Sequence, residues 1–315
     1  MKKHAKPDVG VFAGIDVSAR QISVARLQRG EENPAFTTFA NSASGHTAVV
    51  AFLLHAGDGL RVCLEASGNY SLDVALMLHA HRQVEVSVIN PRRARRFAES
   101  LGERSKTDPV DAYVLCQYAA RMPWESWQPP SSTALRLRAI TRAIESLGVM
   151  HTQENNRAHA LSSSQALPAL VLRERQRHQH YLEHRIKQLR REACRLIARD
   201  PELDRYYRLM LTVPGIAQTS ALQILGELAV LSETSDARQW VAFSGLDPCH
   251  FSSGTSVEKR PRISRGGSRY LRHALYMLSG VIRPFAERTT GQYRMPASVR
   301  TRLVTLHCRF IGDPS

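Results

Sequence analysis

The sequence predicts an α/β domain with a mixed sheet, followed by a mostly helical region. Three short apolar runs come first, and helical and strand-like patterns then alternate as far as residue 121. From residue 132 a helical pattern continues to residue 199. A segment rich in proline and tryptophan, at 122–130, separates the two halves.

Each element of the first half follows from its pattern. Strands show apolar runs or two-residue alternation, whereas helices show the 3.6-residue period. Asp108 and Pro109 form a helix-start signal, with a capping carboxylate followed by proline. The expected elements are strands over 9–17, 21–27, 36–40, 61–66 and 85–90, and helices over 44–54, 70–81 and 108–121. Three early strands before the alternation indicate a mixed sheet flanked by helices.

The second half begins with a long basic arm. Its helical pattern breaks near Leu167 and Pro168. Between residues 173 and 199, nine Arg and Lys side chains occur with three Glu. This face either contacts nucleic acid or is a solvated charged surface. Coiled-coil spacing relates four of its residues, which suggests pairing with another copy: Ile186, Leu189, Ala193 and Leu196.

The net charge of the chain indicates which class of partner it binds. The chain has 43 Lys and Arg against 28 Asp and Glu, a formal charge of +15. Most of these cations are arginine, whose planar fork binds two phosphate oxygens at once. Nucleic acid is therefore the expected partner; a basic protein without such a partner is the alternative. Five scattered cysteines without a Cys-x-x-Cys pair fit a reducing cytoplasm. No apolar run approaches 18 residues, so no membrane segment is expected.

Four carboxylates form the candidate catalytic set. Asp16 and Glu65 each follow a strand-like run, while Asp108 and Asp111 share one face of a helix. Crowded acids repel each other unless a cation joins them, and Mg²⁺ prefers such oxygen ligands. A pair of these ions can clamp a phosphodiester, so the set predicts a Mg²⁺ site acting on nucleic acid. Ordinary helix capping is the alternative for Asp108 and Asp111.

Two later segments carry further signals. Residues 211–221 resemble a helix-hairpin-helix turn, in which Pro214 and Gly215 bend the chain and backbone N–H groups meet a phosphate; a plain packing turn is the alternative. Residues 252–272 begin with small and hydroxyl side chains, and no acid occurs from 259 to 286. This segment either hosts a nucleophile with its phosphate clamp or is a Ser/Gly-rich loop before a basic helix. Its cations are Lys259, Arg260, Arg262, Arg265, Arg269 and Arg272.

Several of these phrases together resemble the IS110 family of insertion-sequence transposases. Gly14-Ile15-Asp16-Val17, Leu64-Glu65-Ala66-Ser67-Gly68-Asn69-Tyr70, Val88-Ile89-Asn90-Pro91 and Lys106-Thr107-Asp108-Pro109-Val110-Asp111-Ala112 resemble its RuvC-like domain. Val213-Pro214-Gly215-Ile216, Phe243-Ser244-Gly245-Leu246-Asp247-Pro248, Ser253-Gly254-Thr255-Ser256 and 262–276 resemble its C-terminal transposase domain, of the IS116/IS110/IS902 type. The phrases occur in the family's order over roughly residues 9–285.

The resemblance implies a fold and a set of partners. It implies a RuvC-like, RNase H-type domain, then a helical coiled-coil arm, then a small, mostly helical transposase domain. The RuvC-like domain would span 8–122, followed by a linker at 123–131. The arm would span 132–200, the transposase domain 205–288 and a tail 289–315. It also implies DNA strand exchange by a homo-oligomer, a dimer or a tetramer, in which a bridge-type guide RNA pairs with donor and target DNA.

The resemblance also assigns site residues. By motif position, Asp16, Glu65, Asp108 and Asp111 would hold Mg²⁺, and Ser253 would form a transient phosphoserine link to DNA. The chain departs from the family at Ser244, where alanine is more usual, and neighbouring Ser252 and Ser256 are the alternative nucleophiles. The cations expected to bind nucleic acid are those of 259–272 together with Arg92, Arg93, Arg95 and Arg96.

Three expectations complete the sequence analysis. A metal-dependent, structure-specific nuclease is the first alternative function, because the four acids alone would support it. A catalytically impaired nucleic-acid-binding remnant is the second. The resemblance fades after about residue 288, so the tail is expected to be atypical or truncated, with apolar surface left exposed at Leu275, Met277, Leu278 or Ile282.

Overall fold

The chain divides into two compact units, Met1–Pro129 and Pro130–Ser315. The computed structural model describes residues 9–54, 59–66, 68, 70–103, 107–162, 168–213, 215–231, 235–253, 257–276 and 278. The expected tail at 289–315 therefore lies outside the described residues. Among the helices that are described, none combines the length and the apolar character needed to cross a bilayer.

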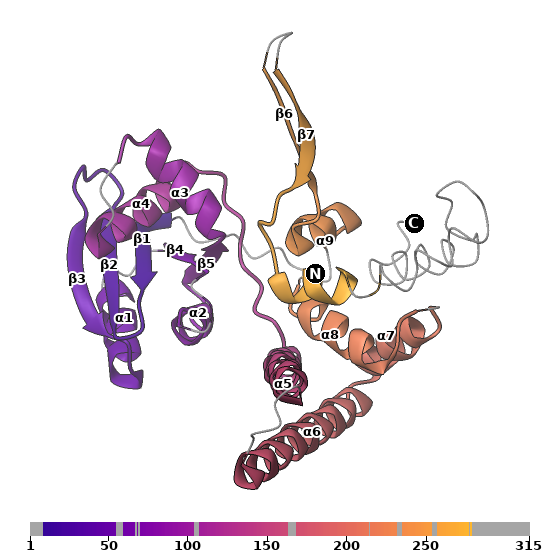
Figure 1. Cartoon of the computed structure of the whole chain (residues 1–315). Helices are drawn as coiled ribbons and strands as arrows, with labels where there is room; N and C mark the ends of the chain where they lie inside the picture. Colours follow the sequence, from indigo (N-terminus) through magenta and orange to yellow (C-terminus); the bar gives the residue numbers. More distant parts are fainter. Residues whose placement is uncertain are drawn as a thin grey trace. The chain divides into compact units, whose positions relative to one another are not determined.

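A five-stranded mixed sheet forms the centre of the first unit (Figure 1). Its strands are β1 (Val9–Val17), β2 (Gln21–Gln28), β3 (Ala35–Ala40), β4 (Gly59–Glu65) and β5 (Val84–Ile89). They lie in the order β3-β2-β1-β4-β5. The first three pair antiparallel, whereas β4 and β5 run parallel to β1. This is the mixed, RuvC-like α/β arrangement predicted from the sequence.

Helices cover both faces of this sheet. They are α1 (Ala43–Leu54), α2 (Leu72–His79), α3 (Pro91–Ser100) and α4 (Asp108–Arg121). Ile15 and its alternate neighbours on β1 pack with α1 and α2, including Leu53 and Leu78. On the other face, Cys63 of β4 packs with Leu115 of α4. Both faces of the central strands are thus buried, which explains their nearly continuous apolar sequences.

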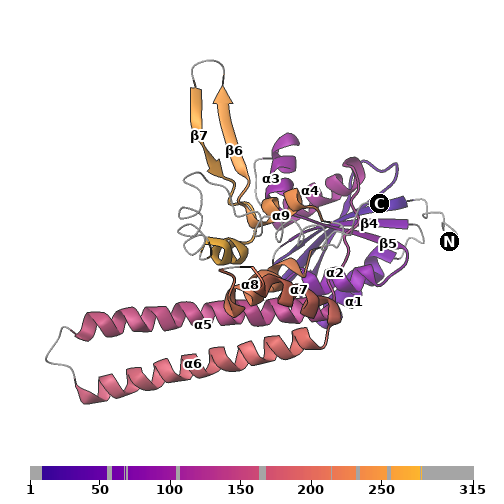
Figure 2. The ribbon, with the colours of Figure 1, turned by 90° about the vertical axis from the view of Figure 1, so that its right-hand side faces the viewer.

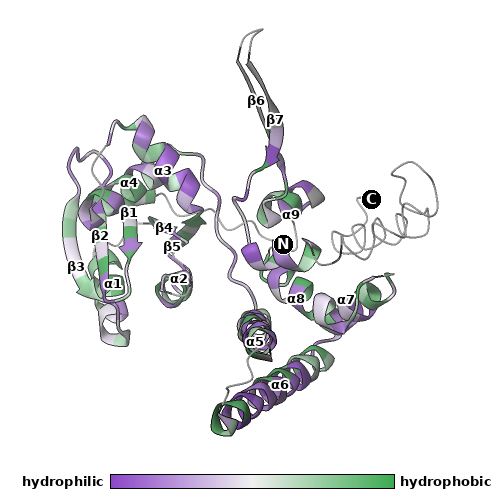
Figure 3. Ribbon diagram, in the orientation of Figure 1, coloured by the Kyte–Doolittle hydropathy of each residue, from purple (hydrophilic) through white to green (hydrophobic). Residues whose placement is uncertain are grey.

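The second unit begins with a long helical hairpin (Figure 2). Helices α5 (Ser132–Ser162) and α6 (Ala169–Ala198) pack against each other. Most of α6 is hydrophilic (Figure 3). Of the residues at coiled-coil spacing, Ala193 and Leu196 are buried in the unit's own core, and Ile186 and Leu189 are half-buried. Pairing of this arm with a second copy stays a prediction.

Short elements follow the hairpin, and each has a clear local signal. They are α7 (Pro201–Leu211), α8 (Gln218–Leu228), α9 (Ala237–Ser244), β6 (Pro248–Ser253) and β7 (Val257–Ile263), and residues 269–276 are helical. Asp200 caps α7 by accepting from the backbone N–H groups of Glu202 and Leu203. Asp236 and Gln239 form a capping box that begins α9.

Two elements differ from the expected pattern. Pro91 was expected to end a strand, yet it is also the first residue of α3, whose N-cap Asn90 accepts from the backbone N–H of Arg92. The hydroxyl-rich segment near 252 was expected to be a loop, but its residues form the antiparallel hairpin of β6 and β7. The otherwise helical second unit therefore contains a two-stranded sheet.

Apolar residues near the end of the described chain are covered. Leu278 is 5% exposed, and Leu275 is half-buried against the same core. The expectation of exposed apolar surface is therefore wrong at Leu278, because this side chain packs with the α7–α8 core. Met277 and Ile282 lie outside the described side chains.

A buried carboxylate connects three parts of the second unit. The Glu227 side chain on α8 is 1% exposed. It accepts two hydrogen bonds from Arg142 of α5, at 2.6 and 2.9 Å, and one from the Ser268 hydroxyl, at 2.7 Å. The Arg142 guanidinium also lies over the Tyr270 ring, 4.5 Å from its centroid. These bonds fix the arm and the segment after β7 to α8.

Removal of this carboxylate is expected to destabilise the second unit. Glu227→Ala leaves Arg142 half-buried without its bidentate partner, which costs about 3 kcal/mol of unfolding free energy. Denaturant unfolding measures the change. Glu174→Ala is the matched control, because Glu174 forms an exposed pair with Arg177 on α6 and such pairs contribute about 0–1 kcal/mol. Equal losses in the two variants would contradict the structural role of Glu227.

Candidate active site

Two neighbouring strands bring the first two carboxylates together. β1 and β4 are parallel, and Ile15 pairs with Leu64. The next residue on each strand is therefore a carboxylate, Asp16 on β1 and Glu65 on β4. Because parallel strands end at the same edge of a sheet, both acids lie at the carboxyl edge, where α/β folds form their sites.

The other two carboxylates come from the first turn of α4. Asp108 is its first residue, and the backbone N–H of Asp111 bonds to the carbonyl of Thr107 at 2.9 Å. α4 packs directly against β1 at Gly14. A Cβ atom on Gly14 would lie closer than 3.0 Å to backbone atoms of Ala112 and Cys116. The missing side chain therefore lets the helix approach close enough to place its acids beside Asp16.

The electrostatics of Asp16 include the charges of the other three acids. The pKa of Asp16 is raised from its ordinary value of 3.8 to about 6. Burial is the largest cause, and the charges of Asp111, Asp108 and Glu65 add to it, in that order, while a backbone bond from Val17 lowers the pKa. The ionised form of Asp16 is thus disfavoured by both desolvation and like charge.

The carboxylates have the chemistry of a hard-cation site but not yet its closed geometry. Their oxygens are the ligands that Mg²⁺ and Mn²⁺ prefer, and a cation would relieve the repulsion at Asp16. Within the described ranges, however, no three His, Cys, Asp or Glu side chains are grouped closely enough to hold one ion. Ligation would therefore require these side chains to move closer together.

A cleft of about 600 Å³ opens beside this edge, between α3 and α4. Glu65 and Asp111 line it, as do Arg95, Glu99 and Glu103. Glu99 and Glu103 did not emerge from the sequence as site residues. Arg95 and Glu99 are four residues apart and form an ion pair at 3.2 Å. This spacing would have placed both on one helix face if a helix had been expected over this segment.

The four arginines of α3 have different surroundings. Arg92 and Arg96 are exposed. Arg93 pairs with Glu125 at 3.2 Å and lies over the Tyr118 ring. Arg95 pairs with Glu99 in the cleft wall. Because exposed ion pairs are weak, phosphate can compete for these guanidinium groups.

Ser253 is the last residue of β6. Its backbone pairs with Val257 of β7, and Ser252 pairs with Glu258. The side chains of Ser252 and Ser253, like those of Lys259 and Arg260, are not described, and Ser256 lies outside the described residues. The expected nucleophile is therefore placed by its backbone alone, near the tip of a hairpin.

Four described cations lie at the end of β7 or after it. Arg262 and Arg265 are exposed, and Arg265 has a positive φ of 54°. Arg269 donates to the hydroxyl of its neighbour Tyr270 at 3.0 Å. Arg272 instead donates to the carbonyls of Ser244 and Gly267, both at 3.0 Å. Among the expected nucleic-acid ligands, Arg272 therefore also has a structural role.

The Ser244 phrase forms the base of the hairpin. The buried Ser244 hydroxyl donates to the carbonyl of Val241 at 2.7 Å. Gly245 ends α9 in the left-handed conformation, with φ of 65°. A Cβ on Gly245 would also meet Arg272 and Gly267 at less than 3.0 Å. The serine that replaces the usual alanine is thus accommodated by a local hydrogen bond.

The segment expected to resemble a helix-hairpin-helix turn joins α7 to α8. The backbone N–H of Ile216 bonds to the carbonyl of Val213 at 3.0 Å. The N-cap of α8 is Ala217, which has no side-chain oxygen to accept the first N–H groups of the helix. Both interpretations of this turn, phosphate binding and packing, remain compatible with this geometry.

Comparison with known proteins gives two family matches. Residues 13–163 match a family described as "Transposase", the DEDD transposases of the IS110 type. Residues 207–294 match the "Transposase IS116/IS110/IS902 family". The acidic site lies within the first match, and the hairpin with Ser253 lies within the second.

Individual relatives agree with these matches. The "Pilin gene-inverting protein" of Moraxella bovis is 30% identical over 223 residues, covering 71% of this chain and 67% of that protein. The "Transposase for insertion sequence element IS1328" of Yersinia enterocolitica is 25% identical over 252 residues, covering 72% of each. A RuvC structure from Thermus thermophilus has 15% identity and a TM-score of 0.29, covering 37% of this chain and 98% of its own.

Gly14→Ala is expected to separate α4 from β1. The added methyl group meets helix backbone that cannot move aside locally, so unfolding free energy should fall by about 1–3 kcal/mol. Denaturant unfolding of the full chain measures this loss. Gly148→Ala on α5 is the control, since nothing lies within 4 Å of its Cβ position and alanine favours a helix by about 1 kcal/mol. An unchanged stability for Gly14→Ala would refute the close-contact argument.

Without divalent ions, stability is expected to fall as the pH rises through Asp16's titration. The folded pKa of about 6 exceeds the ordinary 3.8, so the folded state binds the extra proton between these values. Unfolding free energy should therefore decrease from about pH 4 to pH 6 and stay lower above. Asp16→Asn should add about 1 kcal/mol at pH 7.5, after allowance for solvent screening, and almost nothing at pH 4.

Thermal unfolding in chelator at both pH values measures this difference. Asp73→Asn is the control, because Asp73 is an exposed acid in the first turn of α2 in the same unit. That substitution removes a negative charge that the helix dipole favours, so the free energy of unfolding should not increase at pH 7.5. A gain for Asp16→Asn that is equally large at pH 4 would mean that packing, and not charge, is responsible.

Proposed function

Because the chain belongs to the IS110 family of transposases, we propose that it exchanges DNA strands by means of a serine nucleophile and an acidic divalent-metal site. The observation that carries the proposal is the placement of two acids on paired strands and two on the first turn of the helix that packs on Gly14; burial, and then the charges of the other three acids, raise the pKa of Asp16. Such crowding of acids is unfavourable for the fold alone and is typical of functional sites.

The acidic set would hold Mg²⁺. Asp16, Glu65, Asp108 and Asp111 supply hard oxygen ligands at one edge of the sheet. A bound divalent ion supplies positive charge that polarises a phosphodiester. The chain's own contribution is rigid placement: β1 and β4 hold two acids, and the contact at Gly14 holds the other two. Of these acids, Glu65 and Asp111 line the cleft in which a phosphate would lie.

Ser253 would supply the covalent step. Its hydroxyl oxygen attacks phosphorus, the bond from phosphorus to the leaving DNA oxygen breaks, and the hydroxyl proton passes to solvent or a base as the leaving oxygen is protonated. A DNA hydroxyl then attacks the phosphoserine and releases the serine. One phosphodiester bond is stored as one phosphoserine, so the strands rejoin without ATP. Arg262 and Arg265, both exposed near the hairpin base, would neutralise charge on the phosphate.

The partners follow from the family resemblance and the charge. Donor and target DNA are the substrates, and a bridge-type guide RNA would pair with both. The formal charge of +15 supports binding of these polyanions. A homo-oligomer, a dimer or tetramer, would allow acids and serine from different copies to form one site. The name of the Moraxella bovis relative describes inversion of a gene, a rearrangement that must rejoin what it cuts.

A structure-specific nuclease is the second candidate, since the acidic site alone would support hydrolysis. It requires no serine, and the two functions therefore differ in whether a covalent protein–DNA species forms. Water as the attacking group would leave cut ends, whereas serine preserves the bond for rejoining.

Trapping with a nicked suicide DNA substrate tests the proposal. The protein is used with its co-purifying RNA and Mg²⁺, and a covalent adduct is expected for the wild type and for Ser252→Ala. Ser253→Ala should reduce adduct formation at least about 1,000-fold, because the nucleophile is absent. An adduct that persists in Ser253→Ala would transfer the role to Ser252 or Ser256. Metal-dependent cleavage without any adduct would favour the nuclease.

A further inference from the structure

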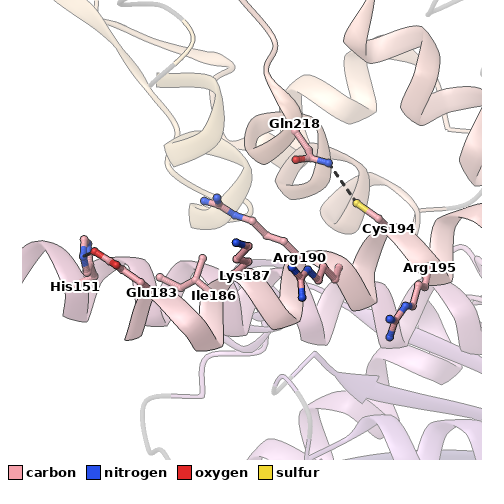
Figure 4. A pocket seen from close by; sticks show the side chains of 9 residues that line it. His151, Glu183, Ile186, Lys187, Arg190, Cys194, Arg195 and Gln218 are labelled. Carbon is pink, nitrogen blue, oxygen red and sulfur yellow. Dashed lines mark hydrogen bonds and ion pairs between the residues drawn. The ribbon is translucent and has the colours of Figure 1, made fainter. Parts of the chain in front are cut away.

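A second basic site lies in the helical unit, away from the serine hairpin in sequence. It is a pocket of about 810 Å³ formed by α5, α6 and the start of α8 (Figure 4). We refer to it as the arm pocket. Its lining residues are His151, Glu183, Ile186, Lys187, Arg190, Arg191, Cys194, Arg195 and Gln218.

Positive charge dominates the arm pocket. Four of its lining residues are Lys or Arg, and all four are on α6: Lys187, Arg190, Arg191 and Arg195. The one acid in the lining, Glu183, contacts His151 at 3.1 Å. Lys187, Arg191 and Arg195 are four residues apart, so they repeat on one helix face at steps of about 6 Å. This row presents a linear series of cations.

Arg190 adds a specific unsatisfied donor. Its Nε atom is buried, and within the described chain it has no hydrogen-bond partner. A buried donor without an acceptor is unfavourable, so a turn of the Arg190 side chain toward a ligand in the pocket would supply the missing acceptor. A phosphate oxygen fits, because the guanidinium fork of arginine binds phosphate through two N–H groups.

The start of α8 closes the pocket at one end. Gln218 is the first residue of that helix, and its side-chain N–H donates to the Cys194 sulfur at 3.5 Å, as Figure 4 shows. The N-cap residue, Ala217, has no side-chain acceptor for the first N–H groups. A helix start of this kind favours an anion, and here it accompanies the cations and the unsatisfied Arg190 donor.

We propose that the arm pocket binds a backbone phosphate of a nucleic acid strand. Ile186 is the one large apolar residue in the lining, and most of the other lining residues carry a charged or hydrogen-bonding side chain. The cations along α6 form a row, and a polynucleotide backbone carries a matching row of negatively charged phosphates. The inference rests on the proposed function only in taking nucleic acid as the ligand, and it does not depend on Ser253 or the acidic site.

Charge-matched variants test the arm pocket. The full chain, freed of RNA and divalent ions, is titrated with fluorescent single-stranded RNA and, separately, with duplex DNA. Lys187→Gln with Arg191→Gln removes two pocket cations. Arg177→Gln with Arg185→Gln removes two exposed cations of α6 that lie outside the pocket lining, so net charge is matched. Arg190→Lys keeps the charge but removes the fork.

The double substitution in the pocket, Lys187→Gln with Arg191→Gln (the pocket pair), should weaken binding about tenfold or more. The slope of log affinity against log salt should become shallower by about 0.7 per lost phosphate contact for single-stranded RNA, or about 0.9 for duplex DNA. Arg190→Lys should weaken binding several-fold with melting temperature unchanged. The double substitution outside the pocket, Arg177→Gln with Arg185→Gln (the control pair), should have a smaller effect on both the affinity and the salt slope. The probe that responds more strongly identifies the natural strand. Equal losses for the pocket pair and the control pair would overturn the proposal, because general charge would then explain both.

Cys194 gives an independent measurement. It lines the pocket and is half-buried, whereas Cys249 is exposed on β6 and Cys63 and Cys116 are buried. Bound nucleic acid should slow alkylation of Cys194, measured by peptide mass spectrometry, and the pocket pair should lose this protection. Unchanged Cys194 labelling at saturating probe would refute occupancy. Neither assay measures strand cleavage, so failure of the trapping experiment and failure of the arm pocket are distinguishable.

Discussion

The candidate active site depends on one contact, the direct packing of the α4 backbone on Gly14 of β1. Strand pairing alone places Asp16 and Glu65 side by side. The other two acids belong to a helix, whose distance from the sheet is set by the side chains between them. Since Gly14 has none, Ala112 and Cys116 approach the strand directly. The Cys116 thiol, 3.5 Å from the Phe12 carbonyl, packs in the same interface. The repulsion at Asp16 is the electrostatic consequence of this closeness.

In the second unit, polar connections accompany an apolar core to which α5, α6, α7 and α8 contribute. Glu227 is buried and fully engaged, with Arg142 on one side and Ser268 on the other. Arg272 bonds to the end of α9 and to Gly267. Both anchors hold the segment that follows β7, so the base of the hairpin is fixed, whereas Ser253 lies toward its tip, at the other end of β6. A nucleophile at such a tip would gain reach from the hairpin and orientation from its base.

Much of the first unit was predictable because its strands are buried on one or both faces, which leaves a strong apolar signal in the sequence. α3 was missed because Pro91 was expected only to end the preceding strand, although Asn90 and Pro91 form the same cap-and-proline signal as Asp108 and Pro109. The hairpin was missed because β6 begins with Pro248 and β7 contains Glu258, Lys259 and Pro261, residue types that are depleted in strands, so its pairing depends on the partner strand. The acidic set was found from its phrases, whereas Glu99, Glu103 and the arm pocket require tertiary neighbours that no local pattern shows.

The distribution of charge has a consequence for how the proposed activity would begin. A phosphodiester entering the cleft beside Glu65 and Asp111 meets negative charge, although the chain as a whole is strongly positive. Basic surfaces on α3 and α6 can attract and hold the strands, but they cannot remove the local repulsion, which decays over a few ångströms and is strengthened by burial. A divalent ion bound at the acids, as proposed above, would supply this neutralisation. Under the proposed function, strand binding and strand cleavage are separable: the first depends on arginine and monovalent salt, and the second on the divalent ion and the serine.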